Sequence, residues 1–448
     1  MSTKKQLCIG LCLISRKKEQ ESEFNSGIEE QVELAKQAEK SKGIEEQVEL
    51  AKQAEKSKLD FVFKADYLVA HPDLIARNKG NVILDPTLLF TAIAYATEKI
   101  GVVTTASTSF YPPYILARQL QSLNWISNGR VGWNIVTSID GAENFGEIGM
   151  PPSEERYAKA AECTALVRKL WGSHPNEVLK ADNPDVIREM VKPIEHNGEY
   201  FKVKGPLNIP QHISGEMPLF QAGASESGRN FAASVADAIF AATPDVESGM
   251  ELRQDLRRRA KQHGRKQDDI RVLPGLYFFI GDTYEEALEM HRQAHQHLTK
   301  EKRYALLEMV LGLDARGIPL ESKITEEMLP SRNQTVRSKT HAELLRNYII
   351  KNEPTVEQIL ERPEVVGSAH WVAVGTAQDV AKQIMDRFEA GALDGFIAIP
   401  GGPPKSLNLF FSEVIPLFVK AGVFRKEYTG STLREHLGGK SPKTLQLK

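Results

Sequence analysis

Short apolar runs alternate with amphipathic stretches along most of the chain. The apolar runs have the length of strands and lie at Gln6–Leu13, Leu59–Ala65, Ile100–Thr105, Val131–Val136, Pro218–Gln221, Ala236–Ala241, Val272–Ile280 and Gly395–Ile399. The stretches between them, where apolar positions recur at helical spacing, include 85–100, 153–171, 249–264, 283–298 and 376–392. Apolar runs separated by helices predict parallel strands covered by helices, which is an α/β fold.

The number of these strands favours one architecture. Eight strands separated by helices predict a (β/α)8 TIM barrel rather than a doubly wound sheet with a switch point. Such a barrel needs about 250 residues, so a chain of 448 residues carries insertions. The clearest insertion is a charged segment with few strand signals at about residues 300–374. We therefore expect a single barrel domain over residues 1–448, with residues 422–448 as a C-terminal tail.

The stretch Gly129–Ser138, GRVGWNIVTS, shows one unit of this pattern most clearly. Its centre, Val131–Val136, is an apolar run with β-branched residues, as in a strand buried on both faces. Before it, Tyr114–Asn128 has helical periodicity and closes on Asn128-Gly129, a common helix stop. After it come polar residues and a glycine-bearing loop, at the end of the strand where barrels keep their chemistry.

One sequence is duplicated near the start of the chain. Gly27–Lys42 is repeated without change as Gly43–Lys58. Sixteen residues at about 100° each leave the second apolar face roughly 160° from the first, so one straight helix cannot dock both copies. We expect Ile44–Lys58 to be the packed helix, because it leads directly into the strand at Leu59, and residues 27–42 to be an extra segment.

Composition and charge exclude several classes of protein. A net charge of −2 argues against nucleic acid or an anionic membrane as partner. No apolar stretch reaches the ~18 residues of a membrane helix. Cys8, Cys12 and Cys163 have no metal or redox spacing, which predicts free thiols in a reducing compartment and hence a cytoplasmic protein.

Polar side chains stand at the carboxyl ends of three predicted strands. Asp66 follows the second strand, Thr105 ends the third, and Asn134, Thr137 and Ser138 lie at or near the end of the fourth. Capping or loop hydrogen bonds explain any one of them. Several polar strand ends in one barrel favour a site.

The stretch Leu219–Ala233 has the pattern of strand, glycine-rich turn and helix start. Gly223 and Gly228 allow close backbone approach, and Ser225 adds a hydroxyl beside a helix N-terminus, which suits a phosphate. An ordinary βα turn explains the pattern equally well. It is not a P-loop, because Arg229-Asn230 stands where a P-loop has Lys-Ser/Thr.

Two other kinds of site are not supported. No G-x-G-x-x-G follows a strand, so we expect no nicotinamide site. His291, His295 and His297 in HRQAHQH include an i, i+4 pair that could bind a metal. No HExxH motif accompanies them, and the surrounding charged residues favour a solvated helix face without a metal.

Several motifs, taken in order, resemble one family. Besides RVGWNIVTS they include KLDFVFKADYL, HNGEYFKVKGPLNIP, QAGASESGRNFAASVADAIF and VGTAQDVAKQIMDRFEAGALDGF, and the resemblance covers most of Leu59–Ala421. The set is similar to the bacterial-luciferase-like FMN-dependent monooxygenases, in the branch of nitrilotriacetate and dibenzothiophene-sulfone monooxygenases (component A). The family fold is a luciferase-like TIM barrel, in agreement with the eight strands.

The resemblance implies a two-component flavin-dependent monooxygenase. Reduced FMN would come from a separate NAD(P)H:FMN reductase and react with O₂ to a flavin C4a-hydroperoxide, which oxygenates a small organic substrate. The protein would bind the flavin and exclude water. A homo-oligomer, dimer or tetramer, is expected by the same analogy, whereas the substrate cannot be read from the sequence.

By position, the resemblance also assigns site residues. Asp66, Thr105 and Asn134 would line the flavin ring pocket, and Tyr157 of SEERY would lie near the flavin. Ser225 would hold the phosphate, with Gly223 and Gly228 shaping the turn. No catalytic residue is assigned.

The chain departs from the family pattern at two places on the expected substrate side. Ser153 replaces a usual His, and SRKKEQESEFNS with the first repeat copy replaces a His- and Trp-containing segment. Two alternatives therefore stand beside the monooxygenase: a flavin-binding homologue with lost or weak turnover, and an F420-type oxidoreductase on the same barrel.

Overall fold

The computed structural model describes residues 6–13, 44–70, 84–296, 298–332, 336, 339–366 and 369–439. The chain divides into two compact units. Unit 1 consists of Met1–Ile9 and Ala222–Arg425, and unit 2 of Gly10–Gln221 and Lys426–Lys448. Each is described by itself.

Unit 2 is built on parallel strands: β1 (Cys8–Cys12, which starts in unit 1), β2 (Phe61–Lys64), β3 (Gly101–Ser107), β4 (Val131–Val136) and β7 (Leu219–Gln221). They lie in the order β1-β2-β3-β4-β7. Side chains alternate between the two faces along each strand, so the register decides which residues share a face. Thr105 is paired with Asn134, and Asn134 with Phe220. These three side chains therefore lie on one face of the sheet.

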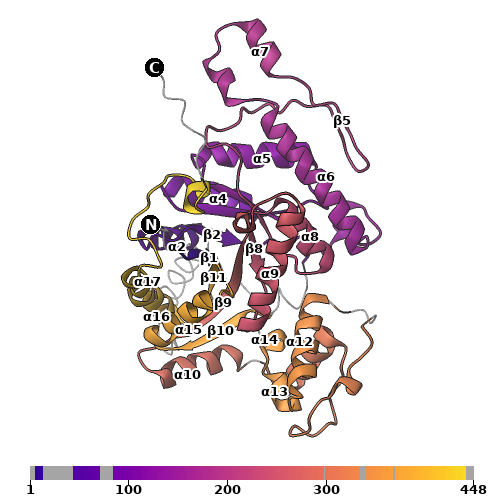
Figure 1. The fold of residues 1–448 in the computed structure, drawn as a ribbon, viewed down its shortest axis with the longest axis vertical. Coiled ribbons are helices and arrows are strands. Elements are labelled where there is room, and N and C mark those ends of the chain that lie inside the picture. Colours follow the sequence, from indigo (N-terminus) through magenta and orange to yellow (C-terminus); the bar gives the residue numbers. More distant parts are fainter. Residues whose placement is uncertain are drawn as a thin grey trace, which may run out of the picture. The chain divides into compact units, whose positions relative to one another are not determined.

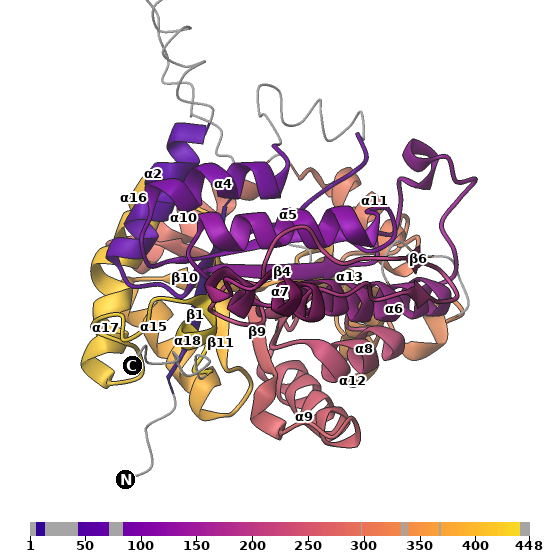
Figure 2. The same ribbon diagram turned by 90° about the horizontal axis from the view of Figure 1, so that it is seen from above.

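The described residues of unit 2 also form six helices. They are α2 (Ile44–Lys56), α4 (Pro86–Ala96), α5 (Pro113–Ile126), α6 (Ser153–Gly172), α7 (Pro184–Met190) and α18 (Leu433–His436), with 3-10 turns η1 (Ala142–Phe145) and η2 (Asn176–Lys180). Of these, α2, α4 and α5 contact the strands β2, β3 and β4. Figure 2 shows α4 and α5 side by side, and the two helices contact each other. The local sequence explains their ends. Asp85 caps α4 ahead of Pro86, and α5 ends before Asn128 and Gly129, which both adopt positive φ.

The second repeat copy forms a packed helix, as predicted. In α2, Leu50, Ala51 and Ala54 are buried. Glu55 accepts three backbone N–H groups, from residues 98, 99 and 100, and so fixes the turn that leads into β3. The first copy, residues 27–42, lies outside the described residues.

The guanidinium of Arg130 joins the starts of β3 and β4. Arg130 is 2% exposed and donates five hydrogen bonds: to the carbonyls of Ala94, Thr97, Ile100 and Ser127, and to the hydroxyl of Thr97. The carbonyls come from the end of α4, the end of α5 and the residue before β3. Helix ends leave such carbonyls without intrahelical partners, so one side chain satisfies both ends and fixes them beside the sheet.

Two further contacts complete unit 2. In the predicted C-terminal tail, α18 buries Leu433, whose side chain lies where a Cβ on Gly101 or Gly132 would be. The hairpin β5 (His196–Asn197) with β6 (Lys202–Val203) is fixed to α6 by Glu162, which accepts from His196 Nε2 and from the N–H groups of residues 200 and 201.

Unit 1 contains the strands β8 (Ala238–Ala241), β9 (Arg271–Ile280), β10 (Trp371–Gly375) and β11 (Gly395–Pro400). Its helices are α8 (Glu226–Val235), α9 (Val246–Gln262), α10 (Tyr284–His295), α11 (Lys300–Leu311), α12 (Lys339–Asn352), α13 (Val356–Leu360), α14 (Pro363–Val366), α15 (Ala377–Glu389), α16 (Pro404–Leu409) and α17 (Ile415–Ala421), with short turns η3 (Gln267–Asp269), η4 (Glu326–Met328) and η5 (Phe410–Val414). Figure 1 labels most of them. A capping box between Thr376 and Asp379 starts α15, in the helical stretch predicted at 376–392.

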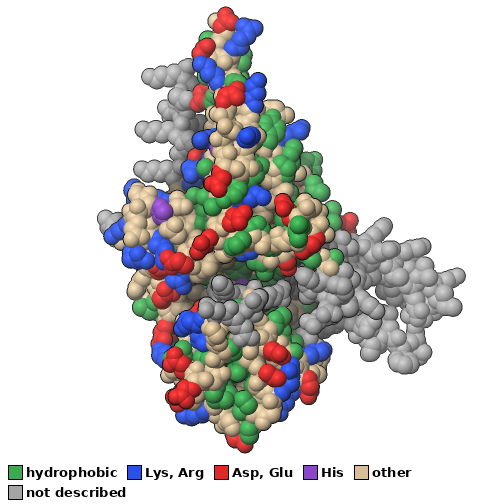
Figure 3. All heavy atoms as spheres, turned by 90° about the vertical axis from the view of Figure 1, so that its right-hand side faces the viewer, with side chains coloured by type: hydrophobic (Ala, Val, Ile, Leu, Met, Phe, Trp, Pro, Cys, Tyr) green, Lys and Arg blue, Asp and Glu red, His purple; other side chains and the backbone are tan. Residues whose placement is uncertain are grey.

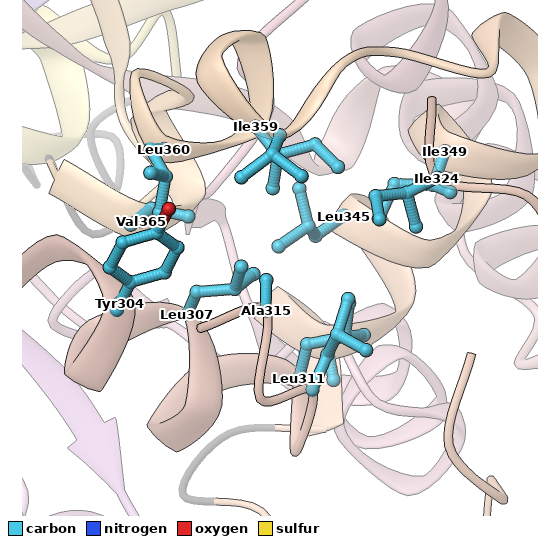
Figure 4. Packing of buried hydrophobic residues seen from close by; sticks show 13 residues of the cluster. Tyr304, Leu307, Leu311, Ala315, Ile324, Leu345, Ile349, Ile359, Leu360 and Val365 are labelled. Carbon is cyan, nitrogen blue, oxygen red and sulfur yellow. The ribbon is translucent and has the colours of Figure 1, made fainter. Parts of the chain in front are cut away.

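The insertion predicted at about residues 300–374 has a hydrophobic core of its own. Helices α11 to α14 bury side chains such as Leu307, Leu345 and Ile359, which point toward one another in Figure 4. The end of this segment corrects the prediction. Residues 371–375 form β10, an added parallel strand paired with β9. Its alternating pattern is only five residues long, too short to stand out in a charged segment.

The strand order of the whole sheet is β10-β9-β11-β1-β2-β3-β4-β7-β8, with a further pairing of β8 and β9. Because β8 also pairs with β9, the sheet closes on itself, as in a barrel. Strand β10 is an added strand beside the eight. All eight predicted strands are present, with ends that differ by a few residues. The predicted (β/α)8 fold is confirmed.

Replacing Arg130 with Met should lower the free energy of unfolding by about 3 kcal/mol or more. The substitution leaves buried carbonyls and the Thr97 hydroxyl without their donor. Chemical denaturation of the full-length protein measures the change. Arg168→Met is the matched control, because Arg168 pairs with Glu216 on the surface and should contribute less than about 1 kcal/mol. Equal effects of the two substitutions would refute the role given to Arg130.

Candidate functional site

Thr105 and Asn134 lie side by side at the carboxyl ends of β3 and β4. Asn134 Nδ2 donates to Thr105 Oγ1 at 3.0 Å, and Thr105 Oγ1 donates to the carbonyl of Lys64 at 2.7 Å. A carbonyl can only accept, so the Thr105 hydroxyl donates to it and accepts from Asn134. This chain fixes the orientation of the Asn134 amide.

The other end of that amide has no partner. Asn134 Oδ1 is buried and makes no hydrogen bond with any residue that the structure describes. A buried unpaired acceptor costs about 1–3 kcal/mol, and it is satisfied by a ligand that presents an N–H or O–H. A flavin ring carries N–H groups and stacks on apolar surface, so the donor set fits the ring that the sequence analysis expects here.

Tyr157 contacts a residue that the sequence analysis missed. Gln221, at the end of β7, donates from Nε2 to Tyr157 Oη at 3.2 Å. The register pairs Gln221 with Ile135, so Gln221 lies on the opposite face of the sheet from Asn134. Gln221 Oε1 is a second buried amide oxygen without a partner in the described part of the chain. A polar residue ending an apolar strand was the available signal.

Asp66 belongs to a small charged cluster after β2. Burial and the nearby carboxylate of Asp85 raise the pKa of Asp66 to about 6. Burial, Asp85 and Asp66 raise the pKa of Tyr111 to about 12, and Tyr111 Oη donates to Asp85 Oδ2 at 3.4 Å. Burial also lowers the pKa of Lys64. Asp66 was predictable from its place after β2, whereas Asp85 and Tyr111 were not, because they are distant from it along the chain.

In unit 1, Ser225 is the N-cap residue of α8. Its Oγ accepts the N–H of Gly228 at 3.2 Å. Capping uses a lone pair of the hydroxyl and leaves its proton for a ligand. The guanidinium of Arg229 already donates to the carbonyl of Ala224 and to the carboxylate of Glu251. It is therefore not available to bind an anion at this turn. The turn with Gly223, Ser225 and Gly228 therefore fits a phosphate at a helix N-terminus.

The histidines of α10 do not form the solvated face that was predicted. His295 is 7% exposed, and its ring lies 5.8 Å from that of Tyr277 and 5.9 Å from that of Phe279. Burial lowers the pKa of His291 to about 4. The aromatic residues of β9 cover this side of the helix, which the helix sequence alone could not show. His297 lies outside the described residues.

The described residues lack both a metal-binding cluster and a membrane-spanning helix. They contain no group of three or more His, Cys, Asp or Glu side chains placed to hold a metal ion. No helix among them is long and apolar enough to cross a membrane. On the face drawn in Figure 3, acidic and basic side chains are interspersed rather than separated by sign.

These features define the class of the protein. Residues 22–394 match the family model of luciferase-like monooxygenases, which is most of the chain. The chain therefore belongs to the luciferase-like monooxygenase family, and its general activity is flavin-dependent oxygenation.

Individual relatives agree with this membership. The chain is 33% identical over 407 residues to nitrilotriacetate monooxygenase component A of Aminobacter aminovorans, covering 87% of this chain and 89% of the relative. It is 32% identical over 371 residues to dibenzothiophene-sulfone monooxygenase of Rhodococcus erythropolis, covering 81% of each. A crystal structure of riboflavin lyase with a modified FMN matches with a TM-score of 0.77 and 26% identity, covering 98% of this chain and 97% of that one. The predicted branch of the family is confirmed.

Replacing Asp66 with Asn should stabilise the protein at neutral pH but not in acid. Because the pKa of Asp66 rises from 3.8 to about 6 on folding, the folded state holds a proton that the unfolded state releases. The contribution of Asp66 to the free energy of unfolding is therefore fully present below about pH 4 and is lost as the pH rises through about 6. We expect Asp66→Asn to gain roughly 1–2 kcal/mol near pH 7.5, after allowance for solvent screening, and nothing near pH 4. Urea denaturation at both pH values measures this, and an equal gain at both would exclude the raised pKa.

Proposed function

We propose that the chain is the oxygenase of a two-component monooxygenase that uses reduced FMN. The overall reaction is reduced FMN plus O₂ plus substrate, giving oxidised FMN, substrate with one added oxygen atom, and water. The observation that supports this best is the unpaired Oδ1 of Asn134, fixed by Thr105 at the carboxyl ends of β3 and β4. Bound flavin supplies the reaction with O₂, and the residues supply its binding and orientation.

The ring would be held by residues at the carboxyl ends of the strands. Asn134 Oδ1 would accept an N–H of the ring, with Asp66 as a further ring-side residue. Tyr157, which is expected near the flavin, contacts Gln221 on the other face of the strands. Asp66 carries a buried Oδ2 with no partner among the described residues, so it can also accept from a ligand. With a pKa of about 6, this carboxyl can hold or release a proton near neutral pH.

The phosphate would be held by the turn before α8. The hydroxyl of Ser225 donates to a phosphate oxygen, Gly223 and Gly228 let the backbone approach, and the N-terminus of α8 adds a favourable dipole. Ser225 is both cap and ligand in this assignment, so the two roles need separate tests.

The partners follow from the same class. A separate NAD(P)H:FMN reductase supplies the flavin, a small organic molecule is the substrate, and the chain acts as a homo-oligomer in the cytoplasm. Cys8, Cys12 and Cys163 are free thiols, which suits a reducing compartment. Two alternatives are outcomes of the test below: a flavin-binding protein without turnover, and an oxidoreductase that uses F420.

The experiment supplies chemically reduced FMN and O₂ to the purified protein with a panel of sulfides, sulfones, alkanes and aminopolycarboxylates. We expect at least one product that is heavier by one oxygen atom. In Ser225→Asp, which keeps a capping side chain but repels a phosphate, the KM for reduced FMN should rise about tenfold or more. The KM for reduced riboflavin should not change.

Thr283→Asp is the matched control, because Thr283 caps α10 in the same way. Flavin binding without any oxygenated product would show the inactive homologue, and turnover with reduced F420 alone would show the other alternative. Equal KM changes for FMN and riboflavin would reject the phosphate assignment.

A further inference from the structure

The strands β9, β10 and β11 of unit 1 have one closed face and one open face. On the closed face, Leu276, Phe278 and Ala398 are fully buried. On the open face, Tyr277, Val372 and Ile399 are each partly exposed. The register pairs Tyr277 with both Val372 and Ile399, so the three form one row across the strands.

The neighbouring rows lie on the same face, but Phe279 and Ile397 in them are fully buried, so the exposed apolar surface is centred on the row of Tyr277. Phe279 is paired with Val374, and Gly401, just after β11, would clash with the Phe279 ring if it carried a Cβ. On the other side, Gly275 is paired with Ile397, and its missing side chain leaves room for the His370 ring. Because these rows belong to the carboxyl half of β9, they lie at the end of the strands where barrels bind ligands.

The open face carries no charged side chain in the three rows. Its polar groups are the Tyr277 hydroxyl and the imidazole of His370, and the imidazole of His291 lies at its edge on α10, packed on Phe279 at 4.9 Å. Burial lowers the pKa of both histidines to about 4, so both are neutral near pH 7. The cation that acts on His291 is Arg303, which already contacts the carbonyl of Leu298 and the carboxylate of Glu361.

One polar atom on this face has no partner. His370 Nδ1 is buried and makes no hydrogen bond within the described ranges, although its ring stacks on Phe240 at 5.3 Å. A ligand that fits an apolar face with one buried nitrogen in need of a partner is largely apolar with one weakly polar centre. A carboxylate would lose its hydration here without a cationic partner, which is costly.

From this surface we propose that the substrate is a neutral, largely apolar organic molecule, bound on the open face of β9, β10 and β11, and not an aminopolycarboxylate or another anion. Calling this molecule a substrate rests on the proposed function, but its binding to this face does not need flavin. Helix α10 contacts β9 and β10 (Figure 1), and its His291 and His295 pack on Phe279 and Tyr277, so it would border the bound molecule.

The test uses two probes that differ by one charge, thioanisole and 4-(methylthio)benzoate. Calorimetric titration of the full-length protein without flavin should show thioanisole binding at least about tenfold more tightly. Val372→Arg, which places a cation in the central row, should weaken thioanisole and strengthen the benzoate. Leu288→Arg adds the same charge at an exposed position of α10 and should change neither.

Three results would overturn the inference: benzoate binding as tightly as thioanisole in the unchanged protein, no effect of Val372→Arg, or competitive displacement of thioanisole by oxidised FMN. The last would assign this face to the flavin. If the binding results are as expected but reduced FMN and O₂ give no oxygenated product from any compound of the panel, this inference stands and the proposed function fails.

Discussion

The arrangement of unit 2 depends on the hydrogen bonds that the buried guanidinium of Arg130 donates. This guanidinium fixes the end of α4, the end of α5 and the start of β3 to the start of β4. The relative position of β3 and β4 is thereby set at their first residues. Six residues are paired between these strands, and Thr105 and Asn134 form one of those pairs. A shift by one residue would turn one of the two side chains to the other face.

The same constraint explains why an unpaired amide oxygen persists at the carboxyl end. The Thr105 hydroxyl is committed to the Lys64 carbonyl, so it can only accept from Asn134. Asn134 cannot turn its oxygen toward Thr105 without losing that bond. The backbone therefore holds an acceptor toward the space that a ligand would fill, and such pre-organised polar atoms are typical of sites rather than of cores.

Much of the fold followed from the sequence, because it depends on local patterns. The eight apolar runs, the Asn128-Gly129 stop and the capping box at Thr376 are all read from neighbouring residues. Strand β10 was missed because it is short and sits at the end of a charged insertion. The second repeat copy was correctly chosen as a helix, because its connection to Leu59 fixes its place.

The candidate site was predictable only in part. Asp66, Thr105, Asn134 and the Ser225 turn carry strand-end and turn signals, and Thr105 and Asn134 do come together. Gln221, Asp85 and Tyr111 were not found, since their roles arise from contacts between distant segments. The helix with His291 and His295 was misread for the same reason. Its sequence is charged, but the aromatic surface that buries His295 comes from β9.

The most direct measurement of the central claim is an anaerobic titration of the protein with reduced and with oxidised FMN. Reduced FMN carries more ring N–H groups than oxidised FMN, and Asn134 Oδ1 is an acceptor without a donor among the described residues. Satisfying that acceptor is worth about 1–3 kcal/mol, so reduced FMN should bind about tenfold more tightly than oxidised FMN. In Asn134→Leu this preference should disappear. Oxidised FMN binding as tightly as reduced FMN to the unchanged protein would contradict the account.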